Sequence, residues 1–147
     1  RARAGIPVIL VDVNVLVAAS VIRHPDHESA RRFLVERLSS DEVLVPDAVW
    51  SGFVRVATSR RVFEKPLTLS EAASYVNAIT RAPGYRSVPG LADGIESFLD
   101  MCVAYGATGN LVSDAYIAAV ARAHACPVAT FDRDFGRFEG IEAIRPS

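Results

Sequence analysis

The sequence predicts one three-layer α/β domain, in which a mostly parallel sheet of about five strands lies between helices. Short apolar runs, such as residues 8–11 and 128–131, alternate with longer segments whose apolar residues recur at helical spacing. Near-continuous apolar runs are typical of strands buried on both faces of a parallel sheet. A chain of 147 residues, 50% of them hydrophobic, can also bury a core of its own. We therefore expect a single domain over residues 1–147, with residues 1–5 disordered or foreign to it.

The N-terminal half is expected to form strands and helices in alternation. Helices are indicated where apolar residues return every three or four positions, and Asp26 stands where it can cap the first of them. Thr68 and Glu71 have the spacing of a capping box, which opens a helix that Pro83 and Gly84 end. The expected elements are a strand at 8–11, a helix at 27–38, a strand at 43–45, a helix at 49–57 and a helix from residue 68 onward.

The C-terminal half continues the alternation, which favours a parallel sheet joined by right-handed crossovers. The alanine-rich segment 113–124 suits a helix that packs close to a sheet, with Ser113 as its N-cap and Asp114 in its first turn. Pro127 ends this helix. The expected elements are a strand at 85–88, a helix at 95–105, a turn at 106–110, a helix at 113–124, a strand at 128–131, a turn or short helix at 132–138 and a strand at 141–144.

Composition excludes several classes of protein. The net charge of −1 argues against a strongly basic nucleic-acid coat, so RNA would have to bind local basic patches. No apolar run approaches the roughly 20 residues of a membrane span, and no signal peptide is visible. Cys102 and Cys126 lack the spacing of paired metal ligands and are expected to be reduced and structural. We expect a soluble protein that is cytoplasmic or, alternatively, released, and that does not bind membranes.

Four aspartates, Asp12, Asp114, Asp132 and Asp134, stand where such a fold collects functional side chains. Asp12 ends the first strand, and Asp132 and Asp134 follow the strand at 128–131. In open α/β sheets, sites form outside the carboxyl ends of strands where the strand order reverses. Carboxylates gathered there repel one another, and a hard cation such as Mg²⁺ or Mn²⁺ relieves the repulsion. Each aspartate alone also fits a helix cap or a turn, so only the group indicates a metal site that acts on phosphate.

Three segments carry a family resemblance: the apolar strand that leads into residues 12–16, the run 111–119 and the segment 130–135. In this order they resemble the motifs of the PIN-domain nucleases and, more narrowly, of the VapC-type toxins of bacterial toxin–antitoxin pairs. The resemblance covers nearly the whole chain. It implies a PIN-like five-stranded parallel sheet, Mg²⁺- or Mn²⁺-dependent endoribonuclease activity on RNA, a neutralising antitoxin and, usually, a homodimer.

The resemblance also implies roles for individual side chains. Asp12, Asp114 and Asp132 are expected to be metal ligands and, together with Asp134, the catalytic residues, with the metal activating a water that hydrolyses a phosphodiester. Hydrogen bonds that orient these ligands are expected from Asn14, Ser113 and Thr130.

Basic and imidazole side chains are the other groups that could meet RNA. The densest basic stretch is expected either to contact RNA phosphates or to form a solvated helix end; it contains Arg55, Arg60, Arg61 and Lys65. No histidine is placed as a general base, and all three are expected to be structural or solvated, namely His24, His27 and His124.

Gly52 departs from the family pattern, because many members carry a glutamate at the matching position. The departure leaves a second function open, in which the chain is a catalytically weakened PIN scaffold that binds RNA or a partner protein. Two other α/β classes fit less well. A receiver domain needs a strand-end lysine, whereas Lys65 lies outside the expected strands, and a dehalogenase-type phosphatase needs an aspartate where Asn14 stands.

Overall fold

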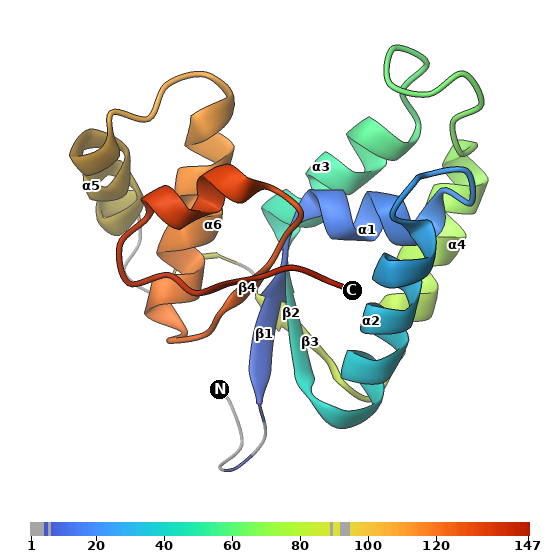
Figure 1. The fold of residues 1–147 in the computed structure, drawn as a ribbon, viewed down its shortest axis with the longest axis horizontal. Coiled ribbons are helices and arrows are strands. Elements are labelled where there is room, and N and C mark those ends of the chain that lie inside the picture. Colours follow the sequence, from blue (N-terminus) through green and yellow to red (C-terminus); the bar gives the residue numbers. More distant parts are fainter. Residues whose placement is uncertain (1–4, 6, 89, 92–94) are drawn as a thin grey trace.

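A five-stranded parallel sheet forms the centre of the molecule (Figure 1). The computed structural model describes residues 5, 7–88, 90–91 and 95–147, so most of the segment 1–5 lies outside the described residues. The strand order is β3-β2-β1-β4-β5, and every neighbouring pair is parallel. The strands are β1 (Val8–Val11), β2 (Glu42–Pro46), β3 (Tyr85–Val88), β4 (Val128–Ala129) and β5 (Ala143–Ile144).

Helices cover the sheet in two groups. In the view of Figure 1, α1 to α4 lie to the right of the strands, whereas α5 and α6 lie to the left. The helices are α1 (Val13–Ser20), α2 (His27–Ser40), α3 (Asp47–Ala57), α4 (Leu69–Thr80), α5 (Ile95–Tyr105) and α6 (Asn110–Ala123), and a 3-10 helix, η1, spans Arg133–Arg137. The predicted fold class, a helix-flanked sheet of five parallel strands, is therefore confirmed.

Most predicted elements agree with the structure. The strands at 8–11 and 85–88 and the helix at 95–105 have the expected bounds. The capping box at the start of α4 is present, because Glu71 N–H donates to Thr68 Oγ1 at 3.1 Å and Thr68 N–H donates to Glu71 Oε1 at 2.9 Å. Asp26 precedes α2 as expected, although its side chain makes no capping hydrogen bond.

Four elements, α1, β4, β5 and α6, differ from the prediction. The segment Val13–Ser20 is a helix that the sequence did not indicate. The last two strands are shorter than expected, because only residues 128–129 and 143–144 pair. Helix α6 begins at Asn110, behind Gly109 with φ 59°, so Ser113 is not its N-cap and Asp114 is not in its first turn.

The two cysteines are unpaired thiols, as predicted for structural cysteines. Burial raises the pKa of the Cys126 thiol to about 11, which leaves this thiol protonated and unreactive near neutral pH. Among the helices of the described part, none is both long and apolar enough to cross a membrane.

Candidate active site

Asp12 and Asp132 leave the sheet at the same edge. Asp12 follows β1, where its N–H donates to Ala129 O at 3.0 Å and its Oδ1 caps α1 by accepting from Val13 N–H at 2.7 Å. Asp132 follows β4 and caps η1, with its Oδ1 accepting from Asp134 N–H at 2.8 Å. Strand β1 lies between β2 and β4. Strands β2 and β3 are added on one side of β1, and β4 and β5 on the other, so the strand order reverses here. This is the point where α/β sheets form ligand sites.

A buried hydroxyl connects Asp12 to the segment after β4. Thr130 Oγ1 donates to Asp12 Oδ2 at 2.8 Å and accepts from Asp132 N–H at 3.0 Å. Asn14 Nδ2 donates to Asp12 Oδ2 at 3.3 Å and to Thr130 Oγ1 at 3.1 Å, while its Oδ1 accepts from Phe131 N–H at 3.1 Å. Asn14 and Thr130 thus both donate to the same oxygen, Oδ2, of the Asp12 carboxylate.

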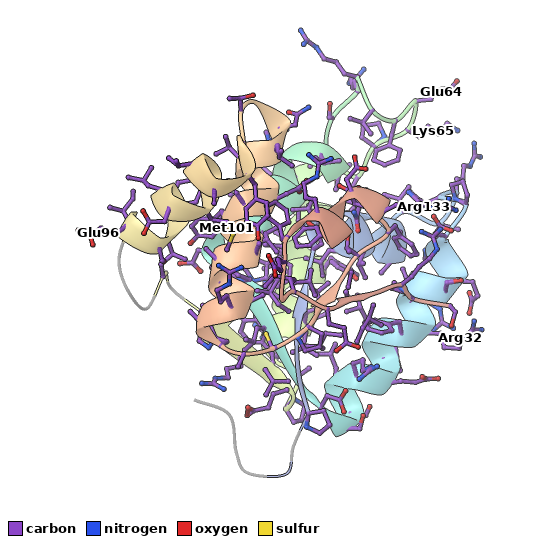
Figure 2. All side chains as sticks on the ribbon, turned by 60° about the vertical axis from the view of Figure 1, so that its left-hand side comes forward. Arg32, Glu64, Lys65, Glu96, Met101 and Arg133 are labelled. Carbon is purple, nitrogen blue, oxygen red and sulfur yellow. The ribbon has the colours of Figure 1, made fainter. Side chains whose placement is uncertain are left out.

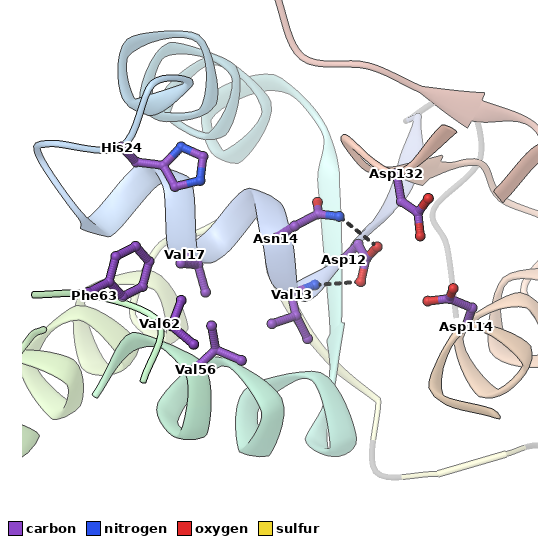
Figure 3. A pocket seen from close by; sticks show the side chains of 10 residues that line it. All are labelled: Asp12, Val13, Asn14, Val17, His24, Val56, Val62, Phe63, Asp114 and Asp132. Atoms are coloured by element: carbon purple, nitrogen blue, oxygen red, sulfur yellow. Dashed lines mark hydrogen bonds between the residues drawn. The ribbon is translucent and has the colours of Figure 1, made fainter. Parts of the chain in front are cut away.

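Asp12, Asp114 and Asp132 line one cavity of about 340 Å³ (Figure 3). Asp114 reaches it from α6. Burial, the charges of Asp12 and Asp132 and a hydrogen bond with Asp132 raise the pKa of Asp114 to about 7. Burial also raises the pKa of Asp12, against the lowering effect of its hydrogen bonds to Thr130 and Val13. These carboxyl groups therefore resist carrying their full negative charge without a cation.

The donor set fits a hard divalent cation. Among the described residues, no lysine, arginine or histidine forms an ion pair with any of these three aspartates. Over the same part of the chain, no group of three or more His, Cys, Asp or Glu side chains is arranged so that it could hold a metal ion by itself. Mg²⁺ usually binds through one or two carboxylates plus waters and substrate phosphate rather than in a cage of protein ligands. The arrangement is that of an open site.

Two predicted site residues lie away from this cavity. The Asp134 side chain is 71% exposed and lies 3.6 Å from Arg137, so only its backbone N–H reaches Asp132. Ser113 is exposed on α6 and lines a second cavity instead. The structure thus gathers three of the predicted aspartates, with Asn14 and Thr130, and leaves Asp134 outside.

The second cavity, of about 430 Å³, shares Asp12 and Asp114 with the first and extends between α3 and α6. Gly52 and Arg55 line it from α3. A Cβ atom on Gly52 would lie 2.9 Å from Val13 Cγ2, closer than side chains pack. The close crossing of α1 and α3 therefore favours glycine at this position.

The other basic residues of the predicted patch lie on the segment between α3 and α4. Arg60, Arg61 and Lys65 are exposed there, and Lys65 stands at the outer edge of the molecule in Figure 2. None of them lines either of the two cavities that contain the aspartates.

His24 and Phe63 line the first cavity, although the sequence did not indicate either as a site residue (Figure 3). Both lie on connecting segments, whose path no apolar periodicity predicts. A phenylalanine within the basic stretch 60–65 is the one signal that could have drawn attention to this segment. His27, by contrast, is structural as expected, because its Nδ1 lies 2.9 Å from Ala18 O.

Comparison with known proteins agrees with the fold. The family model described as PIN domain matches residues 9–141. Ribonuclease VapC31 from Mycobacterium tuberculosis is 38% identical over 138 residues, which are 93% of this chain and 97% of that protein. Ribonuclease VapC43 from the same species is 36% identical over 144 residues, or 94% of this chain and 95% of the relative.

Solved structures with the same fold come from distant sequences. VapC20 from M. tuberculosis, described as a Sarcin-Ricin loop cleaving toxin, superimposes with a TM-score of 0.71 at 22% identity, covering 94% of this chain and 99% of that one. VapBC2 from Rickettsia felis, bound to a DNA fragment from its promoter, also gives 0.71, at 16% identity over 95% of this chain and 99% of the other.

Proposed function

We propose that this chain, which belongs to the PIN-domain family and within it to the VapC ribonucleases, is a metal-dependent endoribonuclease and the toxin of a toxin–antitoxin pair. The observation that carries the proposal is that Asp12, Asp114 and Asp132 line one cavity and that none of them forms an ion pair with a basic side chain of the described residues. Relatives named as ribonucleases, at 36–38% identity over most of the chain, support RNA as the substrate.

Asp12, Asp114 and Asp132 would hold the cation, for which we propose Mg²⁺, with Mn²⁺ as a substitute. When bound, such an ion supplies charge neutralisation to the phosphate and lowers the pKa of an attacking water. Thr130 and Asn14 fix the orientation of the Asp12 carboxylate through hydrogen bonds at 2.8 and 3.3 Å. Asp114, with its raised pKa, releases its proton when positive charge enters the site.

Asp134 takes a lesser part in this proposal than Asp132. Its backbone N–H positions Asp132, a role that does not depend on the carboxylate, and its side chain pairs with Arg137. Ser113 lines the second cavity, so we propose that it does not orient a metal-ligating aspartate. The exposed basic residues Arg55, Arg60, Arg61 and Lys65 are proposed to attract RNA phosphates.

The proposed protein partners are an antitoxin and a second copy of the chain. A homodimer is supported by α5, where Ile95, Leu99 and Val103 are 63%, 50% and 83% exposed at spacings of four residues. An apolar stripe of this kind on a helix surface marks an interaction face. An antitoxin is supported by the similarity to VapBC complexes, and the site of action would be the bacterial cytoplasm.

Gly52 favours a second candidate, in which the scaffold binds RNA or a partner without cutting. It leaves the site without the acid that many family members carry there, and Arg55, one turn further along α3, lines the same cavity. The two candidates differ in turnover, because a binding module protects RNA at equimolar concentration and produces no fragments.

Cleavage of RNA by the purified chain, with Mg²⁺ or Mn²⁺ and then with a chelator, tests the proposal. We expect fragments only in the presence of metal. Because the attacking group is a water rather than the neighbouring 2′-hydroxyl, the fragments should lack 2′,3′-cyclic phosphates. Cleavage by the chain that persists in chelator, or fragments with cyclic phosphate ends, would contradict the proposal.

A further inference from the structure

The cavity that contains the aspartates has a second end that the proposed chemistry does not use. Figure 3 shows Asp114 and Asp132 at one end, and His24 and Phe63 at the other. Between them, the wall near His24 is formed by the apolar side chains of Val17, Val56 and Val62. A charged phosphate site therefore continues directly into an apolar chamber with one aromatic ring and one imidazole.

The imidazole of His24 has a defined orientation. Its Nδ1 accepts a hydrogen bond from Asp26 N–H at 3.0 Å, so the neutral ring carries its proton on Nε2. Nε2 points into the cavity in Figure 3. Within the described part of the chain, Nε2 has no hydrogen-bond partner. His24 thus presents a donor to whatever fills this end.

The facing wall is held in place rather than free. Val62 and Phe63 lie on the segment between α3 and α4, and both backbone N–H groups donate to Ser59 O, at 3.2 and 3.0 Å. Leu67 N–H donates to Ala57 O at 2.9 Å and closes the segment. Val62 is 54% exposed. An apolar wall therefore faces solvent in the same cavity as the carboxylates, instead of packing into the core.

The same segment carries Arg60, Arg61 and Lys65 on its exposed surface. Basic side chains that follow a backbone, combined with an aromatic ring on which a base can stack, are the features by which proteins bind single-stranded nucleic acid. An RNA nucleotide presents matching chemistry, namely a phosphate joined to a flat apolar base with acceptors on its edge.

We propose that the chamber formed by Val17, His24, Val56, Val62 and Phe63 holds the base of the RNA nucleotide next to the scissile phosphate. Phe63 stacks on this base, and His24 Nε2–H donates to an acceptor on its edge, which makes His24 a specificity-determining residue. The inference rests on the proposed function for the identity of the substrate. Beyond that function, it states that His24 and Phe63, on connecting segments, determine the preferred base on one side of the cleaved bond.

Variants that distinguish the roles of the two ring nitrogens of His24 test this proposal. In His24→Asn the amide oxygen can replace Nδ1 as acceptor for Asp26 N–H, but no donor reaches the chamber. In His24→Gln the longer amide can supply the donor at the Nε2 position. His124→Asn, on a ring outside both cavities, is the matched control. Thermal melting should give similar values for all three variants.

The readout is kcat/KM on four RNA oligonucleotides that differ only in the base beside the bond cut by the wild type. We expect His24→Asn to reduce the preference among the four bases about tenfold, His24→Gln to retain most of it, and His124→Asn to leave it unchanged. Phe63→Leu should lower kcat/KM on all four by about tenfold, since it removes stacking but keeps an apolar side chain. Unchanged base preference in His24→Asn would overturn the proposal.

A binding measurement keeps this inference separate from the proposed function. The four ribonucleoside 5′-monophosphates are titrated into the ¹⁵N-labelled protein with Mg²⁺, and the His24 Nε2 resonance is followed. We expect one or two of the nucleotides to shift it and His124 to stay unaffected. If the wild type cut no RNA, the proposed function would fail while this shift could still support the base site. If RNA were cut but no nucleotide moved the His24 signal, the base site would be wrong.

Discussion

Thr130 is the side chain on which the orientation of Asp12 most depends. Thr130 is 3% exposed, and its hydroxyl forms hydrogen bonds with Asp12, Asn14 and Asp132 at once. Thr130→Val keeps the shape but leaves these groups without their partner, which should cost about 1–3 kcal/mol of stability. Because Asp12 then loses its orientation, we expect Mn²⁺ affinity or cleavage to fall about 10–100-fold.

The conservative variant distinguishes orientation from packing. Thr130→Ser keeps the hydroxyl and should retain Mn²⁺ affinity, measured by calorimetry, close to that of the wild type. A Thr130→Val protein that binds Mn²⁺ as tightly as Thr130→Ser would show that the hydroxyl does not position the ligand.

Asp114 should make the metal-free protein less stable as the pH rises. Its folded pKa, about 7, lies above the ordinary value of 3.8, so the folded state binds more protons between these values. Its contribution to stability is therefore complete below about pH 3.8 and is lost as the pH rises to about 7. Asp114→Asn has no such titration and should be more stable above pH 7, by about 1–2 kcal/mol since the carboxylate is only partly withdrawn from water.

Thermal melting of both proteins in chelator, from pH 4.5 to 8, checks this. The gap in melting temperature should widen with pH and should shrink when Mg²⁺ is added to the wild type. A gap that is constant across the range would mean that Asp114 does not titrate with a raised pKa.

At the level of elements, the crossing of α1 and α3 decides what residue 52 can be. Gly52→Glu places a Cβ 2.9 Å from Val13 Cγ2, and overpacking of this kind costs about 1–3 kcal/mol. We expect Gly52→Glu alone to melt earlier and to bind Mn²⁺ no better than the wild type. Val13→Ala/Gly52→Glu removes the clash and should recover stability and bind Mn²⁺ more tightly than Val13→Ala. No gain in affinity in the double variant would contradict a missing ligand at this position.

The sequence predicted those elements whose burial or capping can be inferred from their own residues. Val8–Val11 is a strand buried in the sheet and therefore apolar throughout, and α4 carries its capping box in the letters Thr68 and Glu71. Helix α1 gave no such signal. Its valines favour strands, and Val15 to Ala19 are all buried, so the helix has no polar face over that stretch.

Helix α6 was misplaced at its start for a local reason. Ser113 and Asp114 look like a cap, whereas the chain turns earlier, at Gly109, whose φ of 59° suits glycine. The shift moves Asp114 into the body of the helix, yet its side chain still reaches the cavity. The error in the helix start therefore did not affect the site prediction. The position of Asp114 in the cavity depends on where the helix lies, not on which residue begins it.

At the scale of the whole molecule, the strand order explains which site residues were predictable. Asp12 and Asp132 follow neighbouring strands, so the rule for parallel sheets brings them together. Asp134 follows the same strand but lies on η1, within the turn or short helix predicted at 132–138, and the sequence could not predict that this turn leaves the Asp134 side chain exposed. His24 and Phe63 reach the cavity only through the paths of connecting segments, which depend on tertiary packing.

The exposed stripe on α5 predicts how copies of the chain associate. Val103→Glu, at an 83% exposed position, should weaken or abolish a homodimer observed by light scattering, because it places charges in an apolar contact. Ile22→Glu, at an 81% exposed position outside α5, is the matched control and should leave the mass unchanged. A Val103→Glu protein as dimeric as the wild type would exclude α5 from the interface.

The central claim is that three converging aspartates hold the metal that cuts RNA, and comparison of Asp132→Asn with Asp134→Asn tests it most directly. Asp134 lies two residues after Asp132, and of the two only Asp132 lines the cavity. With Mn²⁺ and equal folding, we expect Asp132→Asn to lose cleavage by several orders of magnitude, in line with several kcal/mol of transition-state stabilisation, and Asp134→Asn to stay within about tenfold of the wild type. Near wild-type cleavage by Asp132→Asn, or equal losses in both variants, would contradict the assignment.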